Sequence, residues 1–262
     1  MSTSSQRLPV RERDFVQSLG RGLAVLQVFS REHPSVTISE AAELTGLTRA
    51  TARRILFTLE QLGYVRSEER RFLPTPRVLA VGYAYLSSMD VWQAAQPFLA
   101  ELADLSQESC SAATLDGTQV VYVARVASPR VMAVNVSVGA RVPAYATSMG
   151  RVLLAGLGPG ALDRYFASVR LAPLTPRTVT DEAELREIVA EVRAQGWCVV
   201  DQELEDGLCS IAAPIYDRLG QVFAALTICG HAGRVTAPQL REEFLPHLLA
   251  AAKQITDQVE RR

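Results

Sequence analysis

Apolar residues recur every three or four positions between residues 48 and 62, which is the period of one face of an α-helix. The residues that form this face are Ala52, Ile55, Leu59 and Leu62. Thr48 can cap the amino end of such a helix, and Gly63 can end it. The pattern therefore predicts a helix whose apolar face packs on a core.

A shorter helix is predicted directly before it. Thr37 and Glu40 have the spacing of a capping box, in which a hydroxyl and a carboxylate satisfy two backbone N–H groups at a helix start. Gly46 can supply the left-handed residue that ends this helix. Two helices joined by so short a turn are typical of a helix-turn-helix.

A hairpin and a supporting helix complete this region. Residues 64–66 and 72–73 are short apolar runs that flank the polar tip 67–71, which predicts a β-hairpin. One stripe of a supporting first helix is formed by Leu19, Leu23 and Leu26. A hairpin directly after the second helix would be a wing, so we expect a winged helix-turn-helix domain over residues 15–75, after a mobile polar tail at residues 1–14.

The exposed side of the second helix is cationic, because Arg49, Arg53 and Arg54 fall away from its apolar face. A helix with an apolar back and a cationic front is typical of a recognition helix, which meets phosphates and base edges. The residues expected to contact double-stranded DNA are Thr48, Arg49, Ala50, Thr51, Arg53, Arg54, Arg70 and Arg71. An amphipathic helix pair with a solvated charged face is the alternative that this window leaves open.

After the hairpin the pattern alternates between strands and helices, which indicates an α+β sensor-like domain. Thr75-Pro76 is a helix start, so a linker helix is expected at residues 76–96 and the second domain at residues 97–262, opening with a helix near Pro97. Strands are predicted at residues 112–115, 120–126, 131–138, 197–201, 210–216 and 221–229. Helices are predicted at residues 149–157 and 159–169, from a Thr180 cap to Gly196, and from Thr236 to the carboxyl end.

Charge is divided unevenly along the 262 residues, although the net charge is only −1. Residues 1–77 hold 12 of the 27 basic side chains and 8 of the 28 acidic ones, which gives this part +4 and leaves −5 for the remainder. A basic amino-terminal part joined to an acidic larger part fits DNA binding confined to the first.

Several classes of function find no support in the sequence. The four cysteines have no CxxC or Cys/His spacing, so neither a zinc site nor a disulfide framework is implied, and no cofactor is expected. The three histidines and the cysteines form no nucleophile–base motif, which argues against an enzyme. No stretch is apolar enough to span a bilayer and no signal peptide begins the chain, so a cytoplasmic protein is expected. An architectural DNA binder without an effector is a further alternative.

Three further segments carry a family resemblance, namely DFVQSLGRGLAVLQVFS (14–30), GARVPAYATSMGRVLLA (139–155) and GWCVVDQELEDGLCSIAAPIYDRLGQVFAALTICG (196–230). Together with the helix-turn-helix, and in this order, they resemble IclR-family transcriptional regulators over essentially the whole chain. The first two are most similar to the branch that controls protocatechuate and p-hydroxybenzoate degradation in the β-ketoadipate pathway.

This resemblance implies a GAF-like effector-binding domain and a homodimer, or a dimer of dimers, on a palindromic operator. It implies no enzymatic activity and no membrane partner. The effector would be a small organic acid, either an aromatic acid of the β-ketoadipate pathway or, as the alternative, an aliphatic acid of another carbon-source pathway.

Carried over position by position, the implied effector-binding residues are Thr147, Ser148, Met149, Gly150, Asp201, Ser210, Thr227 and Cys229. A loop that enters a helix offers backbone N–H groups to a carboxylate, so the chemistry is sensible. The sequence departs from the family at Arg151, where lysine is commoner, at the bulky Met149, and in the order Cys209-Ser210. Without the resemblance, Thr227 and Cys229 are equally well explained as core residues of a strand.

Overall fold

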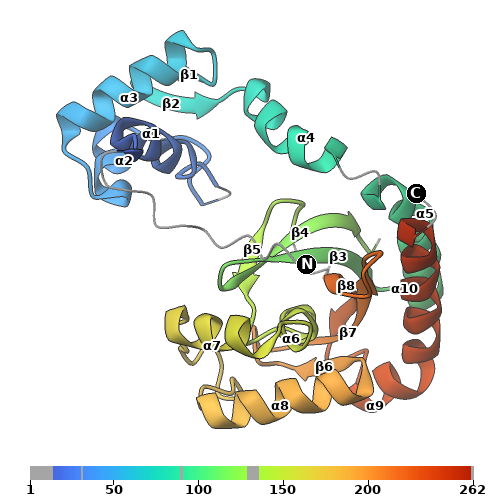
Figure 1. Ribbon diagram of the computed structural model, residues 1–262. Coiled ribbons are helices and arrows are strands. Elements are labelled where there is room, and N and C mark those ends of the chain that lie inside the picture. Colours follow the sequence, from blue (N-terminus) through green and yellow to red (C-terminus); the bar gives the residue numbers. More distant parts are fainter. Residues whose placement is uncertain (1–13, 31, 89–90, 129–135, 261–262) are drawn as a thin grey trace. The chain divides into compact units, whose positions relative to one another are not determined.

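The computed structural model divides the chain into two compact units, Met1–Tyr85 and Leu86–Arg262 (Figure 1). It describes residues 14–30, 32–88, 91–128 and 136–260. The polar tail expected at residues 1–14 therefore lies almost wholly outside the described residues. No described helix has the length and apolar character needed to cross a membrane.

The smaller unit contains α1 (Gln17–Leu26), α2 (Ile38–Thr45), α3 (Arg49–Gln61), β1 (Val65–Glu68) and β2 (Arg71–Pro74). Its predicted caps are confirmed. Thr37 and Glu40 exchange side-chain and backbone hydrogen bonds of 3.2 and 2.7 Å as a capping box. Gly46 ends α2 with a φ of +68°, and Thr48 caps α3 by accepting the N–H of Thr51. The unit is the expected winged helix-turn-helix.

The faces that α1 and α3 bury differ from the prediction. Leu19, Leu23 and Leu62 are 62%, 47% and 51% exposed, whereas Val25 and Leu56 are fully buried. The prediction that Leu62 faces the core is therefore wrong, and the leucine stripe predicted on the first helix is exposed at Leu19 and Leu23. The core of the unit consists of Val25, Val36, Ala41, Ala42, Ala52, Leu56, Val65 and Phe72. Helical spacing identifies an apolar face, but it does not say what covers that face.

The chain leaves the hairpin through a 3-10 turn (Pro76–Val78) and α4 (Leu79–Ser88). Thr75 caps this turn by accepting a hydrogen bond from the N–H of Arg77, as the Thr-Pro pair predicts. These elements are the described beginning of the linker expected at residues 76–96.

The larger unit is built on a six-stranded antiparallel sheet with the strand order β5-β4-β3-β8-β7-β6. Its strands are β3 (Ser109–Asp116), β4 (Gln119–Val126), β5 (Arg141–Pro143), β6 (Cys198–Asp201), β7 (Leu208–Tyr216) and β8 (Val222–His231). The strand predicted at residues 131–138 falls mostly outside the described residues, and its described end, residues 136–138, is not a strand. The edge strand β5 follows it instead.

Helices cover both faces of this sheet (Figure 1). On one face lie α5 (Val91–Ser106), α9 (Ala237–Gln239), a π-helical turn (Leu240–Phe244) and α10 (Leu245–Glu260). On the other lie α6 (Ser148–Ala155), α7 (Pro159–Ser168) and α8 (Glu182–Gln195). The expected α+β class and the helix-covered antiparallel sheet are confirmed.

Two helix starts are corrected. α5 begins at Val91 and contains Pro97, because the buried Trp92 anchors the first turn of the helix in the core. Asp181, and not Thr180, caps α8, since its carboxylate accepts an N–H group of the first turn at 2.9 Å. In both cases neighbouring residues offered two possible starts, and side-chain packing or cap geometry decided between them.

A buried ion pair fastens α6 to two loops. The two Nη atoms of Arg151 donate to the two carboxylate oxygens of Glu203 at 2.7 and 2.6 Å, and the side chains are only 4% and 10% exposed. Arg151 Nε also donates to the carbonyl of Tyr145, and the Glu203 carboxylate accepts the N–H of Val179. This pair thus joins the approach to α6, the loop after β6 and the segment before α8.

We expect Glu203→Ala to lower the free energy of unfolding by roughly 3–5 kcal/mol, because it leaves the Arg151 cation buried without its counter-ion. The matched control is Asp163→Ala, which breaks an exposed pair with Arg186 and should cost less than about 1 kcal/mol. Urea unfolding of the full chain measures both. Equal losses in the two variants would contradict the role given to the buried pair.

Candidate DNA-binding surface and effector pocket

One face of α3 presents most of the residues expected to contact DNA. The exposed members of that set are Thr48, Arg49, Ala50, Arg53, Arg54 and, in the hairpin, Arg70. Thr51 is half-buried, and its hydroxyl lies 2.9 Å from that of Thr48. At about 100° per residue, Arg53 and Arg54 lie on either side of the centre of the exposed face, where Ala50 and Phe57 fall.

The arginines of this unit differ in what holds their side chains. The guanidinium of Arg71 donates to Glu40 at 2.8 Å and so joins the hairpin to α2. The Thr37 N–H and the Arg71 guanidinium together lower the pKa of Glu40. Arg66 pairs with Glu68 on the surface of β1. Among the described residues no ion-pair partner occurs for Arg49, Arg53, Arg54 or Arg70.

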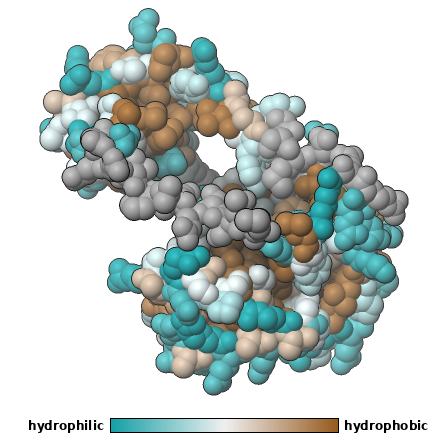
Figure 2. All heavy atoms as spheres, viewed as in Figure 1, coloured by the Kyte–Doolittle hydropathy of each residue, from teal (hydrophilic) through white to brown (hydrophobic). Residues whose placement is uncertain are grey.

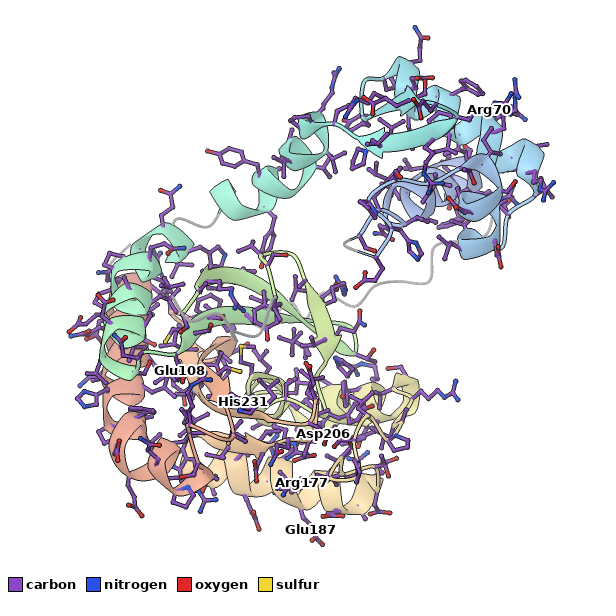
Figure 3. All side chains as sticks on the ribbon, turned by 180° about the vertical axis from the view of Figure 1, so that it is seen from behind. Arg70, Glu108, Arg177, Glu187, Asp206 and His231 are labelled. Carbon is purple, nitrogen blue, oxygen red and sulfur yellow. The ribbon has the colours of Figure 1, made fainter. Side chains whose placement is uncertain are left out.

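The tip of the hairpin is strained. Glu69 and Arg70 form the two-residue turn, with φ of +47° and +70°. Positive φ at both central residues defines a type I′ turn, which normally takes Asn-Gly because side chains at these angles crowd the backbone. The strained turn places Arg70 at the exposed end of the hairpin (Figure 3).

An apolar groove of about 620 Å³ lies beside the exposed face of α3. Its apolar lining comes from four segments. They are α1 (Leu19, Leu23 and Leu26), α3 (Ile55 and Leu59), the residues directly after α3 (Leu62 and Tyr64) and α4 (Val81). Figure 2 shows hydrophobic residues gathered on this unit. Leu62, which the sequence assigned to the core, therefore lines an open surface together with the leucine stripe of α1.

The larger unit contains a small cavity of about 20 Å³ between the start of α6 and the sheet. It is lined by Tyr122, Ala146, Thr147, Ser148, Met149, Val200, Leu204, Leu208, Ser210, Thr227 and Cys229. Six of the eight residues implied for effector binding are thus brought together from α6, β7 and β8.

The other two implied residues lie outside this lining. Gly150 packs against the backbone of Ala144 so closely that a Cβ atom would lie 2.0 Å from the Ala144 oxygen. Asp201 pairs with Arg177 at 2.7 Å in an exposed position, and its neighbour Val200 lines the cavity instead. Because side chains alternate along β6, Val200 and Asp201 point to opposite faces of the sheet, and only the face of Val200 borders the cavity.

Polar groups line one side of the cavity. The Ser148 hydroxyl donates to that of Ser210 at 2.9 Å, and Thr227 donates to the carbonyl of Ile211 at 2.7 Å. The backbone N–H groups of Ser148 and Met149 have no acceptor in the described part of the chain, as is usual at a helix start. The arrangement offers two N–H donors, a helix dipole and the hydroxyl of Ser210 to an anion, because Ser148 and Thr227 already donate their hydroxyl protons.

Burial keeps the thiol at the far side of the cavity neutral. Desolvation raises the pKa of Cys229 to about 12, and it also raises the pKa of the Tyr122 phenol. Both groups can therefore act only as neutral hydrogen-bonding or packing partners near pH 7. No cluster of metal-ligating side chains occurs among the residues that the structure describes.

Sequence reasoning missed the apolar half of the lining. Leu204 and Leu208 lie on and next to the loop after β6, where no periodicity marks them. Tyr122 lies two residues after Val120 on β4, and both side chains pack in the same core cluster. Val200 and Tyr122 could therefore have been found from the alternation of their strands.

Comparison with known proteins agrees with both units. Residues 18–69 match the IclR helix-turn-helix domain, and residues 83–257 match the carboxy-terminal domain of bacterial transcriptional regulators of the IclR type. The chain is 47% identical to the Pca regulon regulatory protein of Pseudomonas putida, over 94% of this chain and 85% of that protein.

Two solved structures are similar as well. A putative transcriptional regulator from Rhodococcus sp. RHA1 is 48% identical with a TM-score of 0.81, covering 94% of this chain and 98% of that one. A double mutant of the PobR inducer-binding domain from Acinetobacter, in complex with 3-hydroxybenzoic acid, is 33% identical with a TM-score of 0.60, covering 64% and 98%. The chain belongs to the IclR family of DNA-binding transcriptional regulators, a family without enzymatic activity.

Proposed function

We propose that this protein regulates genes of protocatechuate degradation by placing α3 in the major groove of a palindromic operator and its hairpin tip on the phosphate backbone. The observation that carries the DNA-binding part is the set of exposed arginines without ion-pair partners among the described residues, Arg49, Arg53, Arg54 and Arg70. Arg71 is proposed to act mainly by holding the wing on α2. The pathway is supported by the likeness to the Pca regulon regulatory protein.

One substitution at the strained hairpin tip should have two effects of opposite sign, on stability and on DNA binding. Arg70→Gly should stabilise the protein by up to about 1 kcal/mol, because glycine relieves the positive φ. The same change should weaken DNA binding and lower the salt slope by about 1, because one phosphate contact is lost. Thermal unfolding and fluorescence anisotropy at several salt concentrations measure the two effects.

Arg70→Lys is the matched control, since it keeps both the charge and the strained backbone. It should leave stability and the salt slope near those of the unchanged protein. An Arg70→Gly variant that binds DNA with the original affinity and salt slope would show that the wing does not reach the duplex.

We further propose that the apolar lining of the groove beside α3 is covered by a second copy of the chain, which leaves Arg54, a polar residue of the same lining, available to DNA. Two-fold half-sites require a dimer, and an exposed apolar groove of about 620 Å³ is the kind of surface that a monomer seldom leaves open. The linker residues 76–90 remain part of the proposed interface, and Leu79 and Tyr83 of α4 are exposed apolar side chains there.

A glutamate in this groove should prevent assembly. We expect Leu23→Glu to turn the oligomer into a monomer, because a charge would be buried at the interface without a partner. Leu44→Glu is the matched control, since Leu44 of α2 is also 47% exposed but lies outside the groove. Analytical ultracentrifugation distinguishes the two, and an unchanged oligomer for Leu23→Glu would exclude the groove from the interface.

The effector is proposed to be an aromatic carboxylate such as protocatechuate or p-hydroxybenzoate, held at the start of α6. Its carboxylate would accept the free N–H groups of Ser148 and Met149, and Ser210 would hydrogen-bond beside it. The related PobR domain binds 3-hydroxybenzoic acid, which supports an aromatic ligand. An aliphatic acid stays the alternative.

The size of the cavity supports a regulatory role for binding. A space of about 20 Å³ has room for about one water molecule, whereas small-molecule pockets usually have about 300–1,000 Å³. A benzoate can enter only if lining residues such as Met149 and Leu204 move. Binding then selects a second conformation, and a tenfold change in DNA affinity needs about 1.4 kcal/mol of coupling.

Calorimetry with protocatechuate and p-hydroxybenzoate tests the pocket. Ser210→Ala should weaken binding by roughly three- to tenfold, because one hydrogen bond of about 1 kcal/mol is lost. Asp201→Asn is the control and should bind as the unchanged protein does, because Asp201 lies outside the cavity. Absence of heat with every aromatic and aliphatic acid would refute the sensor, and an unaffected Ser210→Ala variant would refute only this pocket.

A further inference from the structure

Arg53 differs from the other exposed arginines of α3 in having a fixed support. Its guanidinium carbon lies 4.9 Å from the ring centroid of Phe57, one turn further along the helix. The ring of Phe57 in turn packs edge-on against Phe72, with centroids 5.7 Å apart and an interplanar angle of 89°. Phe72 is buried in the core of the unit. The three side chains form a stack that runs from the core to the exposed face.

The position of Phe57 calls for an explanation, because its side chain is 43% exposed on the face that is proposed to meet DNA. Its contact with Phe72 accounts for part of the ring, but the exposed part of an apolar ring contributes little to folding. At about 100° per residue, Phe57 and Ala50 share the direction of Arg53. The ring therefore lies between Phe72 of the core and the guanidinium of Arg53.

We propose that Phe57 is a positioning residue that holds Arg53 ready to read a guanine in the major groove. The inference rests on the proposed operator binding and names the residue that makes it sequence-specific. A guanidinium stacks through its flat face and donates through its edge, so the ring supports Arg53 while leaving all five N–H groups available. No side-chain hydrogen bond or ion pair occupies Arg53 in the described part of the chain.

The edge of an arginine matches the O6 and N7 acceptors of guanine, which is the commonest specific contact of this residue with DNA. A long side chain that is free in solution must lose rotamer entropy to make such a contact. Because the ring already restricts the Arg53 side chain in the free protein, less rotamer entropy is lost on binding DNA. In the part of the chain that the structure describes, no aromatic ring or carboxylate supports Arg49 or Arg54 in this way. These two arginines suit phosphate contacts, which tolerate several side-chain conformations.

The test uses the full chain and a duplex selected by the unchanged protein from a randomised double-stranded DNA library. Affinity is then measured for this duplex and for each single base-pair variant of it. Phe57→Leu should lower discrimination about tenfold at one G·C pair, within the range of a bidentate base contact, and leave the salt slope unchanged. Phe57→Met gives a second variant without the ring, in case the first fails to fold.

Two controls separate positioning from general stability. Phe57→Tyr keeps the ring and should restore discrimination. Arg53→Lys keeps the charge without the planar fork and should lose discrimination at the same base pair, and the double variant with Phe57→Leu should lose no more. Loss at a different pair would mean that the ring itself contacts a base, which overturns the positioning role.

Full discrimination in both ring-free variants would equally overturn it. The proposed function fails in a distinguishable way, because an Arg53→Ala and Arg54→Ala double variant that binds the selected duplex with unchanged affinity would remove α3 from the DNA interface altogether.

Discussion

The ion pair between Arg151 and Glu203 is the constraint on which the sensing unit depends. Two buried charges cost free energy to desolvate, and here that cost is offset by paired hydrogen bonds at 2.7 and 2.6 Å and by further bonds to Tyr145 and Val179. The four groups come from three separate segments around the cavity. Because Glu203 lies directly before Leu204, the pair also fixes the base of the loop that closes the cavity. The pair therefore holds Leu204 of the cavity lining next to a rigid part of the unit.

In the winged unit, too, the role of each arginine depends on the group that holds its side chain. Carboxylates hold Arg66 and Arg71, so these two cations stabilise the hairpin and its attachment to α2. Arg53 is held by an aromatic ring, which fixes its position without neutralising its charge. Arg70 is held only by the strained turn that carries it. The same residue type therefore serves three physical purposes within one small domain, and the local partner decides which.

Local signals in the sequence predicted much of this fold, because they depend on residues close in the chain. The Thr37–Glu40 capping box, the glycine-ended helices and the hairpins are of this kind. Features that depend on distant residues were not predictable. Leu19 and Leu23 form a correct helical stripe, yet nothing in their spacing says that the core lies on another face. Likewise Leu204 lines the cavity from the loop after β6, where no periodic pattern marks it.

The two ends of the six-stranded sheet carry a consequence for how copies of the protein can meet. Its edge strands are short, three residues in β5 and four in β6, whereas the central strands β7 and β8 have nine and ten. β5 also ends in Pro143, which has no N–H to offer. Such edges discourage the growth of a continuous sheet from one chain to the next. They therefore favour association of copies through side-chain surfaces over extension of the sheet.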